Sequence, residues 1–380
     1  MEKIKLGDLC KTSAGQIKED EDTLIDYIDI SSVDNETKKV TGYQTITFGE
    51  APSRARKAVK RGSVLVSTVR PNLNAVALLE EDTPNVSVAS TGFCVLESKD
   101  DVDPRFILNF CKSKTFIDDM VSQATGASYP AVSDKIVRSA LVPKYSYQEQ
   151  QHISNVLDKL AGIIDGRRIE LQQLDDLIKA RFVELFGDPI KNTKSLKVRR
   201  LEEIGTWNSG GTPSRTKPEY FTGDINWYSA GELNSLYLHG SIEKITAAAI
   251  EESAAKLFRA GSMLVGMYDT AAFKMGILKE DSASNQACAC IEPNESVNIV
   301  WLYYALSLMK ENYLSQRRGV RQKNLNLGMI RGFELPVAEK IDQDEFVTFV
   351  KQVDKSKVAV QKALDETQTL FNSLMQEYFG

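Results

Sequence analysis

Apolar residues recur at alternating three- and four-residue steps in two long stretches of the chain. The first seam comprises Ile153, Leu157, Leu160, Ile164, Leu171, Leu174, Ile178 and Leu185, and the second comprises Phe346, Val350, Val353, Val360, Leu364, Phe371, Leu374 and Tyr378. An apolar seam of period 3.5 over nearly five heptads is typical of a coiled coil. We therefore predict long helices over 146–188 and 341–380. An amphipathic helix on a globular core would explain either seam alone, but two seams in the same phase favour pairing.

The chain also repeats itself. Glu184–Gly187 recurs as Glu377–Gly380 at an offset of 193, and Gly62–Val66 aligns with Gly261–Val265 at an offset of 199. Such self-similarity indicates a tandem duplication whose halves are about 190 residues long. If a pseudo-two-fold axis relates the halves, their long helices run antiparallel.

The segments before the two helices have the pattern of mixed α/β (α+β) domains, predicted over 1–145 and 189–340. Short β-branched and apolar runs predict strands at 63–69, 74–79, 92–96, 263–267 and 287–291. Helical periodicity marks 103–121 and 297–314.

Composition agrees with a multidomain globular protein. The 380 residues are 42% hydrophobic and 26% charged, which excludes disorder and predicts two or three folding units. The longest uncharged stretch with an apolar run, 296–309, is too short for a membrane helix. The N-terminus lacks the pattern of a signal peptide, and five scattered cysteines are typical of reduced thiols, so we expect a cytoplasmic protein.

Catalytic and metal-binding signatures are missing from the sequence. It contains no P-loop, no HExxH and no glycine-rich cofactor loop, and only two histidines, His152 and His239. The Cys288–Cys290 pair has no second ligand pair nearby and is typical of a buried strand. We therefore expect a chain without catalytic residues, metal or cofactor of its own.

Charge is distributed unevenly although the net charge is only −5. Segment 191–340 carries 19 basic against 16 acidic residues, whereas 146–190 carries 5 against 8 and 341–380 carries 4 against 7. Acidic helices should avoid a nucleic-acid backbone and are better suited to protein partners.

Basic clusters interleaved with polar and aromatic residues are the candidate binding sites. Arg and Lys neutralise phosphates, and Arg, Asn and Gln can bond base edges. A solvated surface would explain any one cluster equally well. The candidate DNA contacts are Arg54, Arg56, Lys57, Lys60, Arg61, Arg70, Asn72, Asn74, Ser128, Tyr129, Thr212, Ser214, Arg215, Lys217, Tyr268, Lys274, Arg317, Arg318, Arg321, Gln322, Lys323 and Asn324.

Several local sequences, in this order and duplicated, carry a family resemblance. They are Leu6–Leu9, Tyr147–Ile153, Arg181–Pro189, Ser209–Arg215 and Gly223–Trp227. With them the chain resembles the specificity (S) subunits of type I restriction-modification systems over essentially its whole length. It departs from the pattern at Ser13–Gln16, where the Gly-Thr-Pro-Ser loop is missing, and at Ile341–Phe346, which lacks a clear Glu-Gln-Gln start.

The resemblance implies two target recognition domains joined by two long spacer helices. Each domain would read one half of a bipartite, asymmetric double-stranded DNA target. Two methyltransferase subunits with S-adenosylmethionine would methylate adenine N6, and restriction subunits using ATP and Mg²⁺ could join the complex. Two alternatives stay open at this point, namely a self-contained methyltransferase or nuclease and a coiled-coil scaffold that does not bind DNA.

Overall fold

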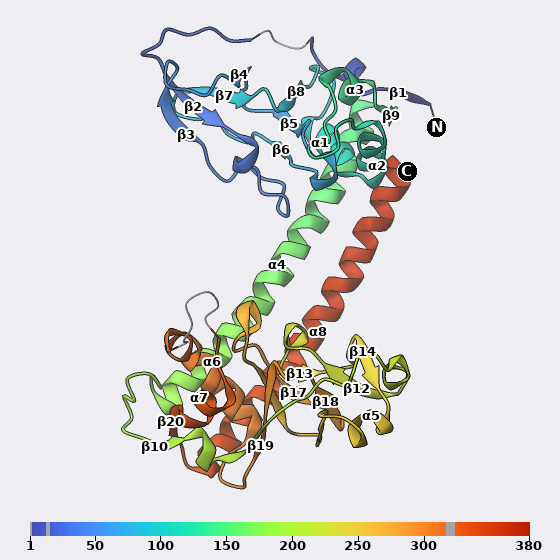
Figure 1. Ribbon diagram of the computed structural model, residues 1–380. Helices are drawn as coiled ribbons and strands as arrows, with labels where there is room; N and C mark the ends of the chain where they lie inside the picture. Colours follow the sequence, from blue (N-terminus) through green and yellow to red (C-terminus); the bar gives the residue numbers. More distant parts are fainter. Residues whose placement is uncertain (1, 13–15, 317–323) are drawn as a thin grey trace. The chain divides into compact units, whose positions relative to one another are not determined.

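The computed structural model describes residues 2–12, 16–316 and 324–380, except for the side chain of Asp269. The chain divides into two compact units, unit 1 (residues 1–168 and 361–380) and unit 2 (residues 169–360). Each unit therefore contains one α/β domain and a part of both long helices, as the colours along the chain in Figure 1 show.

The described residues of unit 1 contain nine strands, three short α-helices and part of each long helix. The strands are β1 (Lys3–Lys5), β2 (Leu24–Ile28), β3 (Gln44–Thr47), β4 (Ala55–Ala58), β5 (Ser63–Ser67), β6 (Val76–Leu78), β7 (Val86–Ser90), β8 (Phe93–Glu97) and β9 (Leu141–Pro143), and the helices are α1 (Pro104–Lys112), α2 (Lys114–Gln123), α3 (Asp134–Ser139) and the first half of α4 (Tyr147–Phe186).

Unit 2 repeats this order with additions. Its strands are β10 (Lys197–Arg200), β11 (Gly205–Ser209), β12 (Ile225–Tyr228), β13 (Tyr237–Leu238), β14 (Glu243–Ile245), β15 (Leu257–Phe258), β16 (Met263–Gly266), β17 (Met275–Leu278), β18 (Ser282–Ser284), β19 (Cys288–Pro293) and β20 (Glu334–Val337), and its helices are the second half of α4, α5 (Ala247–Glu251), α6 (Ile299–Ser315), α7 (Leu327–Gly332) and the first half of α8 (Lys340–Phe379).

The strand connections confirm the internal repeat predicted from the sequence. The order β3-β2-β7-β4 in unit 1 corresponds to β14-β12-β18-β15 in unit 2, and in both sheets the central pair is parallel while the outer pairs are antiparallel. The three-stranded sheet β6-β5-β8 corresponds to β17-β16-β19, which β13 and β11 extend in unit 2. Ribbon β1-β9 likewise corresponds to β10-β20.

The five predicted strands and three of the four predicted helices occur within a few residues of their expected places, whereas 103–121 is not one helix. It is divided at Ser113, whose backbone is extended and whose hydroxyl accepts a hydrogen bond from the Phe116 amide at 3.2 Å. A serine in this position caps the following helix. The apolar period continues on both sides of Ser113 and therefore does not reveal the break.

The long helices begin at an identical buried contact. Gln150 at the start of α4 accepts a hydrogen bond from the Asp103 amide at 3.1 Å, and Gln343 at the start of α8 accepts one from the Asn298 amide at 2.7 Å. Asp103 and Asn298 are the N-caps of α1 and α6. Gln343 thus performs the same role as Gln150, although Ile341–Phe346 lacks the Glu-Gln-Gln start.

The seam positions of both helices are all buried or half-buried. Within unit 2, the Lys357 ammonium lies 2.6 Å from the Asp175 carboxylate, and the Phe182 ring lies 5.3 Å from Phe346. From Asp175 to Phe182 the residue numbers on α4 rise, while those of their partners on α8 fall from Lys357 to Phe346. The two helices therefore run antiparallel within unit 2. α4 ends where Gly187 takes φ +76°, a left-handed C-terminal geometry that suits glycine.

A separate core holds each unit. In unit 2, residues of the five-stranded sheet, α6, α7 and both long helices form one cluster centred on the fully buried Trp301. In unit 1, the three-stranded sheet packs with α1, α2 and the helix residues Ile153, Leu157 and Phe379. No helix in the described part of the chain is both long and apolar enough to cross a membrane.

Candidate nucleic-acid interface

Two basic residues of β4 are occupied by contacts within unit 1. Lys57 is only 19% exposed; its ammonium lies 2.6 Å from the Asp134 carboxylate and donates to the Phe93 carbonyl at 2.6 Å. The Arg56 guanidinium lies 4.9 Å from the centre of the Phe48 ring and donates to a backbone carbonyl. Lys57 therefore joins β4 to α3, and the structure does not present it as a surface cation.

The other basic residues of this segment remain on the surface. Arg54 and Lys60 are 58% and 64% exposed, and each approaches an acid, Asp29 at 3.5 Å and Glu97 at 2.9 Å respectively. Exposed ion pairs of this kind are weak, so a phosphate could compete for either cation. Arg61 is exposed, and its backbone amide donates to a loop carboxylate.

The turn after β5 separates two candidates that are near neighbours in sequence. Asn74 is buried and donates to the Cys111 carbonyl at 2.9 Å, in the left-handed conformation at φ 48°. It therefore anchors the turn to α1. Asn72 and Arg70, on the same turn, are exposed.

The loop between α2 and α3 carries Ser128 and Tyr129, both exposed. The Arg70 guanidinium lies 4.8 Å from the centre of the Tyr129 ring. The structure thus brings together an arginine and a tyrosine that are 59 positions apart in the sequence.

The glycine-rich loop of unit 2, 209–215, is threaded tightly between neighbouring segments. A Cβ on Gly210 or Gly211 would lie within 2.3 Å and 2.0 Å of backbone oxygens, so only glycine fits. The buried Trp227 indole donates to the Gly211 carbonyl at 3.0 Å. The sequence Gly-Gly therefore determines the loop's path.

Arg215, at the end of this loop, is engaged on two sides. Its guanidinium donates to both carboxylate oxygens of Glu243 at 2.5 and 2.7 Å, and it lies 4.2 Å from the Phe221 ring centre and 5.3 Å from that of Trp227. The hydrogen bond to Glu243 raises the pKa of Arg215 and lowers that of Glu243. Since Arg215 is 55% exposed, it closes the loop while keeping part of its surface in solvent.

A second group of hydrogen-bonded side chains, Lys217, Tyr220 and Glu252, follows Arg215 in the sequence. The Lys217 ammonium donates to the Tyr220 hydroxyl at 2.6 Å, and that hydroxyl donates to Glu252 at 2.6 Å. These hydrogen bonds raise the pKa of Lys217 and lower that of Glu252. Thr212 donates to a glutamine side chain, while Ser214 is exposed.

The remaining candidates of unit 2 are less informative. Tyr268 is 38% exposed, and Lys274 donates to Asn234 at 2.9 Å. Arg317, Arg318, Arg321, Gln322 and Lys323 lie outside the described residues, and the half-buried Asn324 lies at their boundary.

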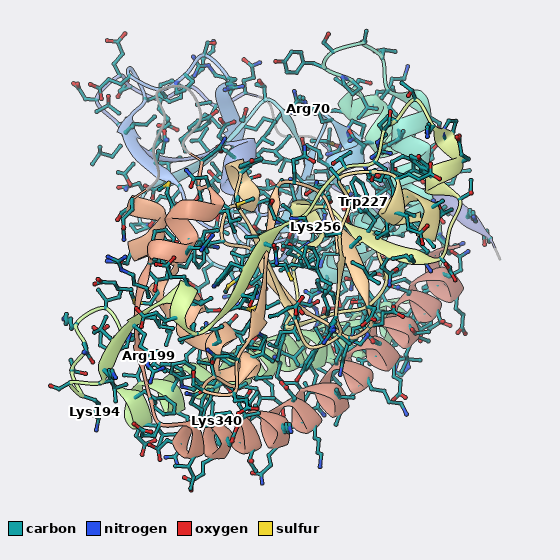
Figure 2. The ribbon with its side chains drawn as sticks, turned by 60° about the horizontal axis from the view of Figure 1, so that its bottom comes forward. Arg70, Lys194, Arg199, Trp227, Lys256 and Lys340 are labelled. Carbon is teal, nitrogen blue, oxygen red and sulfur yellow. The ribbon has the colours of Figure 1, made fainter. Side chains whose placement is uncertain are left out.

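Some exposed cations were not among the sequence candidates. Figure 2 labels Lys194, which precedes β10, and Lys256, which precedes β15. Both are exposed, and neither forms an ion pair within the described residues. Lys194 is one of five basic residues within 191–200, whereas Lys256 stands alone and belongs to no basic cluster of the sequence.

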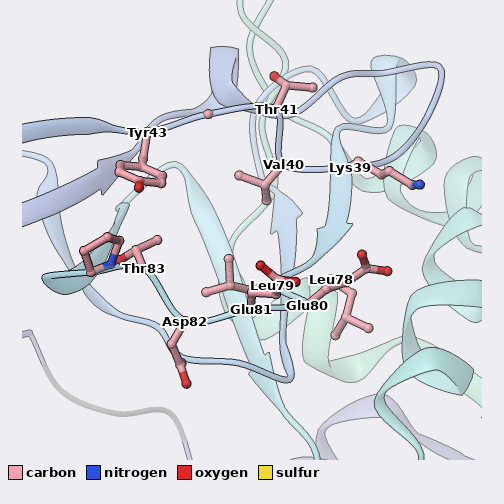
Figure 3. Close-up of a pocket in the computed structure, with 12 residues that line it drawn as sticks. Lys39, Val40, Thr41, Tyr43, Leu78, Leu79, Glu80, Glu81, Asp82 and Thr83 are labelled. Atoms are coloured by element: carbon pink, nitrogen blue, oxygen red, sulfur yellow. The ribbon is translucent and has the colours of Figure 1, made fainter.

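A hollow of about 530 Å³ in unit 1 has the opposite charge. Figure 3 shows Glu80, Glu81 and Asp82 along one side and the segment Lys39–Tyr43 along the other. Three neighbouring acids repel phosphate, so this hollow itself is unsuited to a DNA backbone. No group of His, Cys, Asp and Glu within 2–12, 16–316 and 324–380 could hold a metal ion.

Comparison with known proteins identifies similar chains. The family model described as type I restriction modification DNA specificity domain matches residues 1–174 and again 193–367. The specificity subunit of the type I restriction enzyme EcoR124I/EcoR124II from Escherichia coli is 24% identical over 220 residues, 56% of this chain and 53% of that protein. The MjaIX specificity subunit from Methanocaldococcus jannaschii is 25% identical over 43% of this chain and 39% of that protein. The matches thus span about half, or less, of these curated relatives.

Two solved structures share the fold. One, from work on complex assembly and conformational transition of the type I R-M system, superposes with a TM-score of 0.66 at 21% identity and covers 100% of this chain and 97% of that one. The other, the S subunit of a type I restriction-modification system from M. genitalium, gives 0.59 at 13% identity, covering 100% and 96%.

Proposed function

Because the chain belongs to the type I restriction-modification DNA specificity family, we propose that it is a DNA sequence-specificity subunit without catalytic residues of its own. The observation that carries the proposal is the duplication: the family model matches twice, and the two matched segments have the same strand order. Each unit would read one half of a bipartite target. The surfaces of the two units carry different residues, so the two half-sites would differ.

The exposed basic and polar candidates would make the contacts. In unit 1 these are Arg54, Lys60, Arg61, Arg70, Asn72, Ser128 and Tyr129. Phosphate contacts would position the duplex, and side chains at base edges or faces would supply specificity. Lys57 and Asn74 would act only through the fold, since both are committed to contacts within unit 1.

The long helices would form an antiparallel coiled coil that sets the unread gap between the half-sites. Each helix has 40 residues and is about 60 Å long at 1.5 Å per residue. At 3.4 Å per base pair, this length corresponds to at most about 17 base pairs between outer edges. The antiparallel contacts of Lys357 with Asp175 and of Phe346 with Phe182 support this pairing.

The catalytic groups would belong to partner subunits. Two methyltransferase subunits with S-adenosylmethionine would dock on this chain and methylate adenine N6, a reaction that requires the base to leave the duplex. Restriction subunits requiring ATP and Mg²⁺ could complete the complex. A self-contained methyltransferase or nuclease is not favoured, because the similar curated proteins are specificity subunits.

The direct test is to co-express this chain with its methyltransferase partner in a host without adenine methylation and to map modified adenines by single-molecule sequencing. We expect a bipartite, asymmetric motif that disappears when this chain is omitted. A stable complex that leaves the genome unmodified, or a motif that does not depend on this chain, would contradict the proposal.

The spacer role has its own test. Inserting one heptad in each of α4 and α8, in register, should lengthen the unread gap or abolish modification while the bases of both half-sites stay the same. Altered half-site bases would show that the helices are not the spacer. A seven-residue insertion in the exposed segment 18–22, which carries none of the candidate DNA contacts, serves as the control for insertion itself.

A further inference from the structure

Tyr129 is a large aromatic side chain that the fold leaves exposed. It is 68% exposed, the most of any aromatic residue among the exposed large hydrophobic side chains of the described chain. An isolated apolar side chain on a surface needs no explanation, but this one is held in place by an ordered loop.

Backbone hydrogen bonds fix that loop on both sides of the ring. Thr125 and Ala131 exchange hydrogen bonds at 3.0 and 2.9 Å, which closes the loop at its base. Gly126 takes φ +104°, and a Cβ there would lie 2.9 Å from the Tyr129 carbonyl, so the turn requires glycine. The Arg70 amide donates to the Pro130 carbonyl at 2.7 Å. The tyrosine is thus preorganised for contact with a ligand, and the protein itself does not cover it.

Arg70 supports the ring. Its guanidinium lies 4.8 Å from the ring centre, and it forms no ion pair within the described residues. A hollow of about 670 Å³ opens beside the pair and is also lined by Leu73, which is 46% exposed, and by Asn35. The acids Asp34 and Glu36 line it as well, so the hollow disfavours a phosphate and is better suited to an uncharged base. Proteins stack on nucleobases with aromatic rings, and a planar arginine guanidinium adds to the interaction. Tyr129 and Arg70 supply both groups.

We infer that Tyr129, backed by Arg70, stacks on a nucleobase of the half-site read by unit 1, so that this unit recognises its target partly by unstacking a base step. The inference rests on the proposed DNA-binding function and adds the mode of contact. Aromatic and apolar wedges act in this way in proteins that kink the duplex, and they favour base steps that unstack easily.

At the aligned positions of the sequence, the internal repeat does not reproduce this pair. At the offsets of the repeat, Arg70 corresponds to Asp269 and Tyr129 corresponds to Gln322. Neither residue can supply an aromatic ring or a cation. The half-site read by unit 2 therefore serves as an internal control on the same DNA.

The test uses the complex of this chain with its methyltransferase partner and duplexes carrying the mapped target. 2-Aminopurine, an adenine analogue whose fluorescence rises when it is unstacked, replaces in turn each adenine that is neither methylated nor next to a methylated adenine. We expect a rise at one step of one half-site only. Tyr129→Ala should abolish that rise and weaken binding roughly 5- to 100-fold, the range of one lost base–aromatic stack. Tyr129→Phe, which keeps the ring, should retain both.

The controls separate this inference from the function on which it rests. Tyr147→Ala removes another exposed tyrosine of unit 1, at the start of α4, and should leave the fluorescence pattern unchanged. If wild-type complex binds its target and Tyr129→Ala behaves like wild type, stacking is refuted while the specificity function stands. A defect of Tyr129→Phe equal to that of Tyr129→Ala would assign the contact to the hydroxyl and also refute stacking. Failure of the wild-type complex to recognise any sequence would overturn the proposed function itself.

Discussion

Replacing Phe186 by alanine should destabilise unit 2 far more than unit 1. The Phe186 side chain is 4% exposed, and its ring centre lies 4.9 Å from Phe182, 5.9 Å from Trp301 and 5.7 Å from Phe346. Truncating a buried phenylalanine removes its transfer free energy and leaves a cavity, which together cost about 4 kcal/mol. With a urea dependence of about 2 to 3 kcal/mol per molar, the midpoint should fall by about 1.3 to 2 M.

Tryptophan fluorescence measures this effect selectively. The three tryptophans of the chain, Trp207, Trp227 and Trp301, all lie in unit 2. The matched variant is Phe379→Ala, which removes the residue that corresponds to Phe186 in the repeat. Phe379 is fully buried in unit 1, where its ring centre lies 5.3 Å from that of Phe106.

The two variants should therefore give different curves. Phe186→Ala should shift the tryptophan curve by the full amount. Phe379→Ala should shift it much less, while it lowers the hydrogen-exchange protection of α1 and α2. An equal shift for both variants would show that the units unfold as one, and a shift below about 0.5 M for Phe186→Ala would refute the packing argument.

Three further outcomes are expected, the first two from the structure and the third from the sequence. Burial raises the pKa of Asp354 in the folded state above its ordinary value of 3.8. The folded state therefore loses stability as the pH rises from 3.8 through that raised pKa. Asp354→Asn should raise the unit 2 urea midpoint at pH 7, and this gain should vanish below pH 3.8. All five cysteines are buried, and burial raises the pKa of Cys10 to about 11, so a thiol reagent at pH 8 should label none of them until urea unfolds the chain. Arg321→Ala with Lys323→Ala should weaken recognition of one half-site only; equal loss at both, measured by adenine mapping, would contradict the two-unit assignment.

Local sequence patterns predicted the elements well because they depend on near neighbours. The seam positions, the strands at 63–69 and 287–291 and the end of α4 before Pro189 all follow from periodicity and turn chemistry. The break at Ser113 was missed, since an apolar period does not reveal a residue whose side chain caps the next helix.

The chemical role of each basic residue could not be predicted in the same way. Lys57 is neutralised by Asp134, 77 positions away, and Arg215 by Glu243, 28 positions away. The sequence shows the charge of each residue but not its partner, so a cluster of cations contains both structural and accessible members. Arg70 and Tyr129 were both candidates, but their pairing depends on two loops that meet only in the fold.

A polar contact of one buried residue, Asp26 in unit 1 and Asn226 in unit 2, shows which positions of the duplication are constrained. In unit 1, Asp26 of β2 accepts hydrogen bonds from the Asn85 amide groups at 2.8 and 3.1 Å. At the corresponding place in unit 2, Asn226 of β12 donates to the Glu280 carboxylate at 2.5 Å.

The acid and the amide have exchanged places between the units, yet the bond between the two segments remains. A buried polar group without a partner is costly, so a change on one side of this contact requires a matching change on the other. The exposed pair Arg70 and Tyr129 is under no such constraint: Asp269 and Gln322 in unit 2 replace it without preserving either its charge or its aromatic character. Packing thus keeps the two units alike in fold while their surfaces diverge, and two alike folds with different surfaces are what an asymmetric target requires.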